Sequence, residues 1–544
     1  MSSRSKTPSF VATFELSQLQ GGGSFKDIDT MSEFYRKIYN AGLGICLKSL
    51  KSMKASEEWA TARKMPKIKE SDRKARGKAF SDLVKKYGLE EYSIQKSVKN
   101  LVDGDEAFCL WTNSAVVQKV AKRIFQAMEK LQYGQAKRVR FKRKGDFFSF
   151  EGKSNKTGVR LTEEEGTFIC LIGNKSYRLS YDMDNPYHVH ALSSRVKYGR
   201  ILRKTIKGKE RYFVQGIFEG LPYEDKAKKE RHRKIVKDRE GHDYYKRRKS
   251  LPNDIRFSVA TDFGPGSIAV ATPLTSFERP ISLGVDKKQK KVKTLQRSMD
   301  KKRRLSNPDN YQDNGTIKKG KKTWNNSKKY LKERRKKADT ERRKAAERKS
   351  SHGFLSNQIL AYGKNHKTEK ISYKGWQKGW FGKSIRHHAP SALEGELSRK
   401  AEYARGRSER INTYQTALSQ HCLCGERRKK ALSERTHACP KCGLTAKRDT
   451  LAAFLAIFCS KEITKNGEEK WTLDLRSARF FARGHRTLSV SGKSHPRETI
   501  KAKPSLASSS VMDEKTAEMV AEKTLDFALE PSSKRDGSGR KSTV

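Results

Sequence analysis

The sequence has no long apolar run, no cysteine framework and few acidic residues beside its many basic ones. No stretch approaches the roughly 18–20 consecutive apolar residues that a membrane-spanning helix needs. The opening residues, MSSRSKTPSF, lack the apolar core of a secretory signal peptide. Four of the eight cysteines stand alone at distant positions, which is typical of reduced thiols in the cytoplasm. We therefore expect a cytoplasmic protein with no membrane partner.

An excess of positive charge dominates the composition. The 544 residues include 120 lysines and arginines against 61 acids, which gives a formal net charge of +59. Self-repulsion of this size opposes compaction unless a polyanion neutralises it. Nucleic acid is the first candidate, because each neutralised phosphate releases counterions. The excess is greatest between 281 and 350, where 26 basic residues face 8 acidic ones. We expect long basic helices within 287–349 that face nucleic acid.

Hydrophobic periodicity divides the chain into helical and β regions. Residues 27–132 follow a helical period, best seen in an apolar stripe on a helix that Ser114 could cap. Residues 133–223 alternate as strands do, with a hairpin turning at Gly208, and predict a small, barrel-like antiparallel domain. A highly charged helix or linker follows at 224–254. The predicted fold class is therefore α+β with several domains.

Four cysteines close together in the segment 421–445 predict a structural zinc ribbon. They are Cys422, Cys424, Cys439 and Cys442. Four thiolates suit one tetrahedral Zn²⁺, and the glycine after each pair lets the backbone turn sharply around the metal. Because the first pair has a CxC spacing, tighter than CxxC, His421 or His437 could replace one thiolate.

Several motifs, taken in chain order, resemble those of a known family. They are ATDFGPGS, LQRSMDKKRR, TEKISYKGWQKGWFGKSI, ALSQHCLCG and CPKCGLTAKRDTLAAFLA. Together they cover about residues 255–460 and resemble the TnpB transposon nucleases and the miniature type V CRISPR effectors related to them. More loosely, RVKYGRILRKTIKGKERYFVQGIFEG looks like the wedge domain of that family.

The resemblance implies an RNA-guided DNA endonuclease with a RuvC-type, RNase-H-like α/β nuclease domain into which the zinc ribbon is inserted. Its partners would be a guide RNA and double-stranded target DNA, and its oligomeric state would be a monomer or an asymmetric dimer. Such a protein works in the prokaryotic cytoplasm, at the nucleoid when engaged, in transposition or antiviral defence. The implied domains are the N-terminal strand of the wedge domain (1–26), a helical recognition domain (27–132), the wedge β domain (133–223), a charged linker (224–254), the first part of the nuclease domain (255–420), the zinc ribbon (421–445), the last part of the nuclease domain (446–485) and a largely disordered tail (486–544).

Three acidic residues match the catalytic positions of that family: Asp262, Glu369 and Asp449. Phosphodiester hydrolysis needs a positioned water and charge relief on the attacking and leaving oxygens, which two Mg²⁺ ions held by carboxylates provide. Glu369 follows an unusually polar segment, GKNHKT, so Glu394 and Glu396 are alternatives for the third ligand.

Basic residues are expected to bind the nucleic acids. They are Arg297, Lys301, Lys302, Arg303, Arg304, Arg334, Arg335 and, beside the last acid, Arg448. Two other functions fit parts of the same pattern. One is an RNA-guided DNA-binding protein that does not cut, which the intact acidic triad opposes. The other is a non-catalytic zinc-ribbon RNA-binding protein, which leaves the ordered DFG, TEK and KRD segments unexplained.

Overall fold

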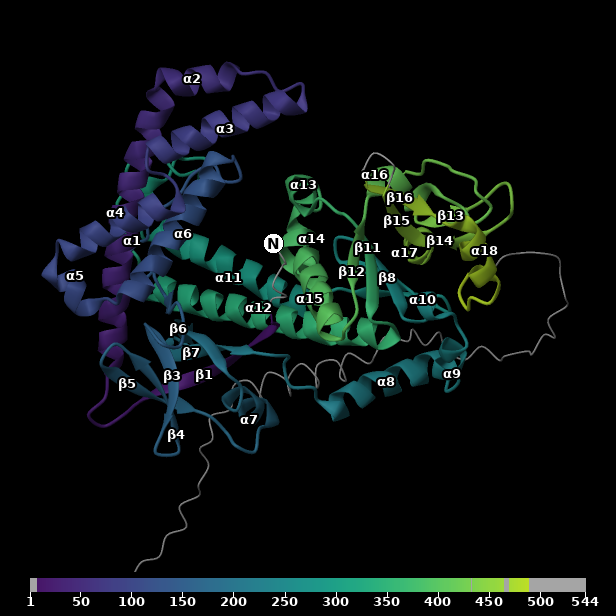
Figure 1. The fold of residues 1–544 in the computed structure, drawn as a ribbon, viewed down its shortest axis with the longest axis horizontal. Helices are drawn as coiled ribbons and strands as arrows, with labels where there is room; N and C mark the ends of the chain where they lie inside the picture. Colours follow the sequence, from purple (N-terminus) through teal and green to yellow (C-terminus); the bar gives the residue numbers. More distant parts are fainter. Residues whose placement is uncertain (1–6, 432, 464–468, 489–544) are drawn as a thin grey trace, which may run out of the picture. The chain divides into compact units, whose positions relative to one another are not determined.

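The computed structural model describes residues 7–431, 433–463 and 469–488 (Figure 1). The tail expected to be disordered at 486–544 lies, from residue 489 onward, outside the described residues. The chain divides into two compact units, Met1–Glu224 and Asp225–Val544. Within the described part of the chain, no helix has the length and apolar character needed to cross a membrane.

The first unit contains a seven-stranded antiparallel sheet in the order β2-β6-β7-β1-β5-β4-β3. Its strands are β1 (Ser9–Gln18), β2 (Ser149–Glu151), β3 (Val159–Glu164), β4 (Thr167–Ile172), β5 (Lys175–Ser180), β6 (Val196–Ile206) and β7 (Lys209–Glu219). The β6–β7 hairpin turns through Lys207 and Gly208, whose φ angles of 51° and 82° are left-handed. This confirms the hairpin predicted at Gly208.

The expectation of a barrel is corrected, because this sheet does not close. Among the described residues, β2 pairs only with β6 and β3 only with β4. The ends of the sheet approach each other by side-chain packing instead. Val159 covers Gly199, where an added Cβ would lie 2.8 Å from the valine Cγ1. A three-residue edge strand also offers too few backbone groups to join the opposite edge along its length.

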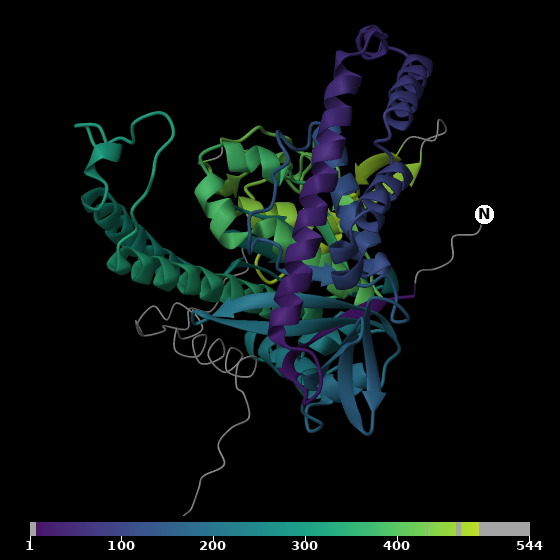
Figure 2. The same cartoon turned by 90° about the vertical axis from the view of Figure 1, so that its left-hand side faces the viewer.

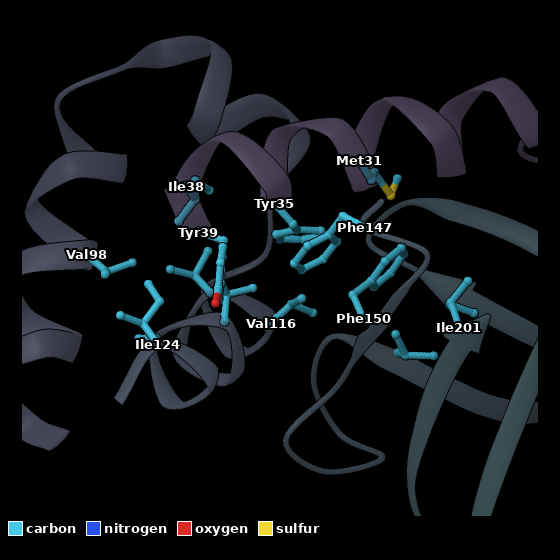
Figure 3. Packing of buried hydrophobic residues seen from close by; sticks show 14 of the residues in the cluster. Met31, Tyr35, Ile38, Tyr39, Val98, Val116, Ile124, Phe147, Phe150 and Ile201 are labelled. Carbon is cyan, nitrogen blue, oxygen red and sulfur yellow. The ribbon is translucent and has the colours of Figure 1, made fainter. Parts of the chain in front are cut away.

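Seven helices of the first unit accompany the sheet. They are α1 (Phe25–Ala55), α2 (Glu57–Lys64), α3 (Glu70–Lys86), α4 (Glu91–Asp103), α5 (Glu106–Trp111), α6 (Ser114–Gln132) and α7 (Pro186–Leu192). The predicted apolar stripe of α6 is buried, although the cap is Asn113 and not Ser114. Figure 3 shows Tyr35 and Tyr39 of α1 meeting Phe147 and Phe150, so helices and sheet share one core.

The second unit is built on a five-stranded mixed sheet in the order β10-β9-β8-β11-β12. Its strands are β8 (Ser258–Phe263), β9 (Ser267–Ala271), β10 (Ser276–Pro280), β11 (Asn365–Glu369) and β12 (Ser408–Ile411). β8, β9 and β10 form an antiparallel meander, while β11 runs parallel to both β8 and β12. The long insertion between β10 and β11 therefore returns the chain to the middle of the sheet.

Helices complete the second unit. They are α8 (Lys226–Glu240), α9 (Tyr244–Lys249), α10 (Asn253–Arg256), α11 (Val285–Leu305), α12 (Lys328–Tyr362), α13 (Tyr373–Lys378), α14 (Gly382–His388), α15 (Pro390–Tyr403), α16 (Thr413–Thr416), α17 (Arg448–Ile457) and α18 (Leu475–Arg483). Two short hairpins, β13 (Thr436–Ala438) with β14 (Thr445–Lys447) and β15 (Cys459–Ile463) with β16 (Glu469–Leu473), flank α17. The charged segment at 224–254 forms three of these helices, and its Val236 and Tyr244 join a core.

Strand alternation assigns the two faces of this sheet to different cores. Val259 and Phe263 of β8 pack with α12 and α15 in one core. Ala260, of opposite parity, packs with α17 in the other. Because successive side chains of a strand point to opposite faces, Asp262 lies on the α17 side.

Candidate functional site

Strand register brings the first two predicted carboxylates together. Thr368 of β11 lies opposite Thr261 of β8 in parallel register. The next residues, Glu369 and Asp262, therefore stand beside each other where the two strands end. Lys367, two residues before Glu369, donates to two backbone carbonyls around the end of α17, at 2.6 and 2.9 Å. Glu369 thus shares the α17 side of the sheet with Asp262.

Helix α17 supplies the third carboxylate. Asp449 lies in its first turn, where the positive end of the helix dipole favours an acid. Every residue from Thr450 to Ile457 is buried, so the helix is held firmly against the sheet. The charge of Asp449 acts on both Asp262 and Glu369. The structure therefore brings the three predicted acids to one place.

Burial makes the carboxyl groups of Asp262 and Glu369 bind protons more tightly than usual. It raises the pKa of Asp262 well above the ordinary value, and the negative charges of Glu369 and Asp449 raise it further. Burial likewise raises the pKa of Glu369 to about 7, although the backbone N–H of Leu418 lowers it. Partly buried carboxylates that repel one another are strongly stabilised by a bound cation.

Two arginines contact Asp449: Arg435, directly before β13, and Arg448, the first residue of α17. Arg448 Nε lies 2.9 Å from Asp449 Oδ1, and Arg435 Nη1 lies 3.2 Å from Asp449 Oδ2. Arg448 also donates to the carbonyls of Ala431 and Glu434, at 3.2 and 3.0 Å, and is only 8% exposed. Nε and Nη1 of Arg448 are thus bonded within the protein, and its contact with a phosphate stays a prediction. Sequence reasoning missed Arg435, since nothing in its local pattern marks it.

The spacing of the acids differs from that of a compact single-ion site. Among the residues that the structure describes, the four cysteines are the one group of three or more His, Cys, Asp or Glu residues whose ligand atoms all lie within 4.8 Å of one another. A pair of divalent ions about 3.5–4 Å apart requires a wider set of ligands than one ion does. Carboxylate oxygens are also the donors that Mg²⁺ prefers. The three carboxylates therefore supply the kind of donor that hard cations take.

The two alternative acids on α15 are already paired with basic residues. Glu394 is 3% exposed, and its Oε1 lies 2.6 Å from Arg410 Nε. Glu396 lies 2.6 Å from Arg399 and 3.4 Å from Lys400. Their charges are thus balanced within the protein, whereas Glu369 adjoins Asp262 through the strand register.

The four cysteines form a site whose geometry suits zinc. Cys422 Sγ lies 3.5 Å from Cys442 Sγ, and Cys424 Sγ lies 3.6 Å from Cys439 Sγ. A tetrahedron with Zn–S bonds of about 2.3 Å places sulfurs roughly 3.8 Å apart. The predicted sharp turns are present, because the glycines that follow the two pairs have left-handed φ angles of 91° and 69°. Burial opposes ionisation of Cys439, but backbone N–H groups lower its pKa to about 7.

Neither histidine proposed as a substitute ligand belongs to this group. His437 is buried, and burial lowers its pKa to about 4. His421 precedes the first cysteine, and burial lowers its pKa as well. The CxC spacing therefore still allows four thiolates to converge.

Seven of the eight predicted nucleic-acid-binding residues lie on two helices, α11 and α12, which run side by side (Figure 2). Five of them are exposed: Arg297, Lys301, Arg304, Arg334 and Arg335. Lys302 is instead 3.3 Å from Glu333 of the neighbouring helix. Arg303 stacks over Trp324, with 3.5 Å between its guanidinium carbon and the ring centroid. These two side chains hold the hairpin together, and the exposed ones form a basic surface.

Comparison with protein families confirms the predicted resemblance. Residues 391–455 match the model described as Cas12f1-like, TNB domain. The matched segment runs from α15 through the four cysteines to α17 and includes Asp449. A comparison with curated proteins finds no match.

Two solved structures are similar to this chain. One is described as the cryo-EM structure of the Cas12f1-sgRNA-target DNA complex, with 13% identity, a TM-score of 0.43, and coverage of 83% of this chain and 98% of that one. The other is a cryo-EM structure of a CRISPR-Cas12f ternary complex, with 11% identity, a TM-score of 0.24, and coverage of 81% and 82%.

Proposed function

We propose that this chain is an RNA-guided DNA endonuclease that hydrolyses phosphodiester bonds at a RuvC-type site formed by Asp262, Glu369 and Asp449. The observation that carries the proposal is the convergence of these acids from two adjacent parallel strands and a helix N-terminus. The family match over 391–455 supports it, since that segment contains the third acid and the cysteines.

The three carboxylates would hold two Mg²⁺ ions, which when bound supply a metal-activated water and relieve charge on the attacking and leaving oxygens. The chain's own residues prepare this site. The sheet fixes Asp262 and Glu369 in one register, and α17, which packs on the same face of the sheet, presents Asp449 to them. Arg448, anchored on the carbonyls of Ala431 and Glu434, orients the Asp449 carboxylate.

The cysteines would hold one structural Zn²⁺. The ribbon lies in the chain between β12 and α17, and β14 ends one residue before α17 begins. Zinc binding in such a segment contributes directly to its folding. A folded ribbon would therefore fix the start of α17 and the position of Asp449.

The remaining regions would hold the nucleic acids. A guide RNA would pair with the target strand, and the protein would grip the backbone of the hybrid. The exposed cations of α11 and α12 provide phosphate contacts, and the net charge of +59 requires a large polyanion. We assign recognition to 27–132, the wedge role to 133–223, and the nuclease domain to 255–420 and 446–485, with the ribbon at 421–445.

The test is cleavage of a matched double-stranded DNA by the protein with its guide RNA. Asp262→Asn and Asp449→Asn should each reduce metal-dependent cleavage by several orders of magnitude and leave complex formation in a gel shift unchanged. Glu396→Gln, an acid paired on α15, is the control and should cut normally. Near wild-type cutting by both aspartate variants would overturn the nuclease assignment. If only Glu369→Gln still cuts, Glu394 becomes the candidate for the third ligand.

Sequencing the RNA that co-purifies with the protein tests the guided part of the proposal. One discrete RNA with a variable end is expected from a guided protein. A mixture of ribosomal and transfer RNA fragments would favour a non-catalytic zinc-ribbon RNA-binding protein.

A further inference from the structure

The segment that follows Glu369 combines exposed aromatic rings with an unbroken positive charge. No acid occurs between Glu369 and Glu394. Trp380 is 100% exposed and the adjacent Phe381 is 44% exposed, although aromatic rings are normally buried. The exposed basic residues of the segment are Lys370, Lys374, Lys378, Lys383 and Arg386. We call residues 373–386 the aromatic–basic platform.

The platform is a built structure. The backbone N–H of Trp376 donates to the Ser372 carbonyl at 3.1 Å, and its ring meets Tyr373 edge to face, with centroids 5.9 Å apart. Helices α13 and α14 pack so closely at Gly382 that an added Cβ would lie 2.4 Å from the carbonyl oxygen of Gln377. The two exposed rings at 380 and 381 therefore sit at a defined turn between two helices.

Both ends of the platform are tied to the strands that hold the acids. Its first residue, Tyr373, is four positions after Glu369. At the other end, Ser384 Oγ donates to the carbonyl of Pro265 at 3.0 Å, in the turn directly after Asp262. Just beyond it, His388 Nδ1 lies 2.9 Å from Ser282 Oγ. These contacts place the platform at the same edge of the sheet as the three acids.

Burial raises the pKa of Tyr373, as do the negative charges of Glu394 and Asp262. The electrostatic influence of Asp262 on Tyr373 agrees with the contacts of Ser384. The ring of Tyr373 therefore lies near Asp262 and contacts the ring of Trp376, and the platform continues along the chain to the exposed ring of Trp380.

We infer that the aromatic–basic platform binds single-stranded DNA and leads it to the three acids, with bases stacking on Trp380 and Phe381 and phosphates contacting the surrounding lysines. Aromatic rings in a positive groove bind single strands in this way, because every base has a face that stacks. A duplex hides those faces between neighbouring base pairs, so the exposed rings favour an unpaired strand. The platform's lack of acids argues against a basic protein partner. The inference rests on the proposed function for the fate of the strand, but its test requires no cutting.

The experiment compares two probes that carry the same number of phosphates, a fluorescent oligodeoxythymidylate and an abasic oligomer of equal length. Binding to the full-length protein is measured at elevated salt, where contacts to phosphate alone are weakened. Wild-type protein should bind the thymidylate more tightly than the abasic probe. Trp380→Ala should weaken thymidylate binding about 10-fold and leave abasic binding unchanged, because one stacked base is lost. Trp380→Tyr keeps a stacking ring and should restore most of the preference.

Two further variants complete the test. Tyr92→Ala removes another exposed aromatic ring, 74% exposed on α4, and should change neither affinity. Substituting Lys374, Lys378 and Lys383 with Gln should weaken both probes equally and flatten the salt dependence. The inference is overturned if Trp380→Ala binds thymidylate like wild type, or if it loses both probes alike. A protein that shows the stacking preference and cuts no matched DNA would refute the proposed nuclease function alone.

Discussion

Arg435 Nη1 lies 3.2 Å from Asp449 Oδ2, so an exposed arginine of the cysteine-rich segment occupies one oxygen of a predicted metal ligand. Its side chain is 58% exposed, and ion pairs of this kind contribute at most about 1 kcal/mol. The pair is therefore weak enough for a divalent cation to displace the arginine.

We expect Arg435→Gln to lower the Mg²⁺ concentration that gives half-maximal cleavage by roughly 2- to 5-fold, because a competing cation is removed. The measurement is the Mg²⁺ dependence of cleavage at saturating DNA. Lys441→Gln, which removes an exposed cation elsewhere in the ribbon, is the control and should leave the dependence unchanged. A higher Mg²⁺ requirement in Arg435→Gln would show that the arginine assists metal binding.

The cysteine group should contain one zinc ion per chain. Cys439→Ser removes a thiolate that lies 3.6 Å from Cys424 Sγ and should release the metal, because four thiolates close the site. Elemental analysis measures the zinc, and limited proteolysis between 421 and 447 should accelerate in the variant. Cys459→Ser, which alters a buried cysteine outside the group, should keep its zinc. Active protein without zinc would contradict this prediction.

Neutralising the exposed cations of the α11–α12 surface should weaken nucleic-acid binding equally for all sequences. The five substitutions to Gln are at Arg297, Lys301, Arg304, Arg334 and Arg335. Each lost phosphate contact should lower the slope of log affinity against log salt by about 0.7–0.9. Lys302→Gln should change the slope little, since Lys302 is paired with Glu333. A loss confined to particular target sequences would indicate base contacts instead.

Stability should fall in mild acid because of a buried histidine. Burial lowers the pKa of His366 to about 4 from an ordinary value of 6.5. As pH falls, this histidine is therefore protonated in the unfolded chain at a higher pH than in the folded protein. The folded state loses stability between pH 6.5 and pH 4 as a result, by up to about 3 kcal/mol. His366→Gln should reduce the slope of unfolding free energy against pH in that window, measured by urea denaturation. The exposed His242→Gln should leave the slope unchanged, and an equal slope in both variants would contradict the prediction.

His366 also explains why part of the site could not be predicted from periodicity. Strand β11 reads Asn-His-Lys-Thr-Glu, without one apolar residue, yet His366 and Thr368 are fully buried. His366 Nε2 lies 2.8 Å from Thr261 Oγ1, and its Nδ1 lies 3.1 Å from Ser408 Oγ. Hydrogen bonds to neighbouring strands thus replace the apolar contacts that a hydrophobic pattern detects. Glu369 is predicted only through the resemblance of its motif.

Other features of the fold show the same difference between local patterns and distant contacts. The cysteine group was predictable because its four ligands lie within one short segment. That the first sheet stays open was not predictable, because the contact of Val159 of β3 with Gly199 of β6 joins residues 40 positions apart in the chain. The surroundings of Arg448 depend on the fold of the loop before it, so its burial and its carbonyl partners left no local pattern.

The pairing of β8 with β11 has a consequence for how the protein is made. Thr368 Oγ1 donates to the Thr261 carbonyl across 107 residues of chain, and parallel pairing over such a distance is slow because a large loop must close first. The α11–α12 hairpin, which forms by local contacts, brings the two strands nearer and shortens the effective loop. During synthesis, α11 and α12 leave the ribosome before α17, which carries Asp449. The surface proposed to bind phosphate is therefore made before the site proposed to cut is complete.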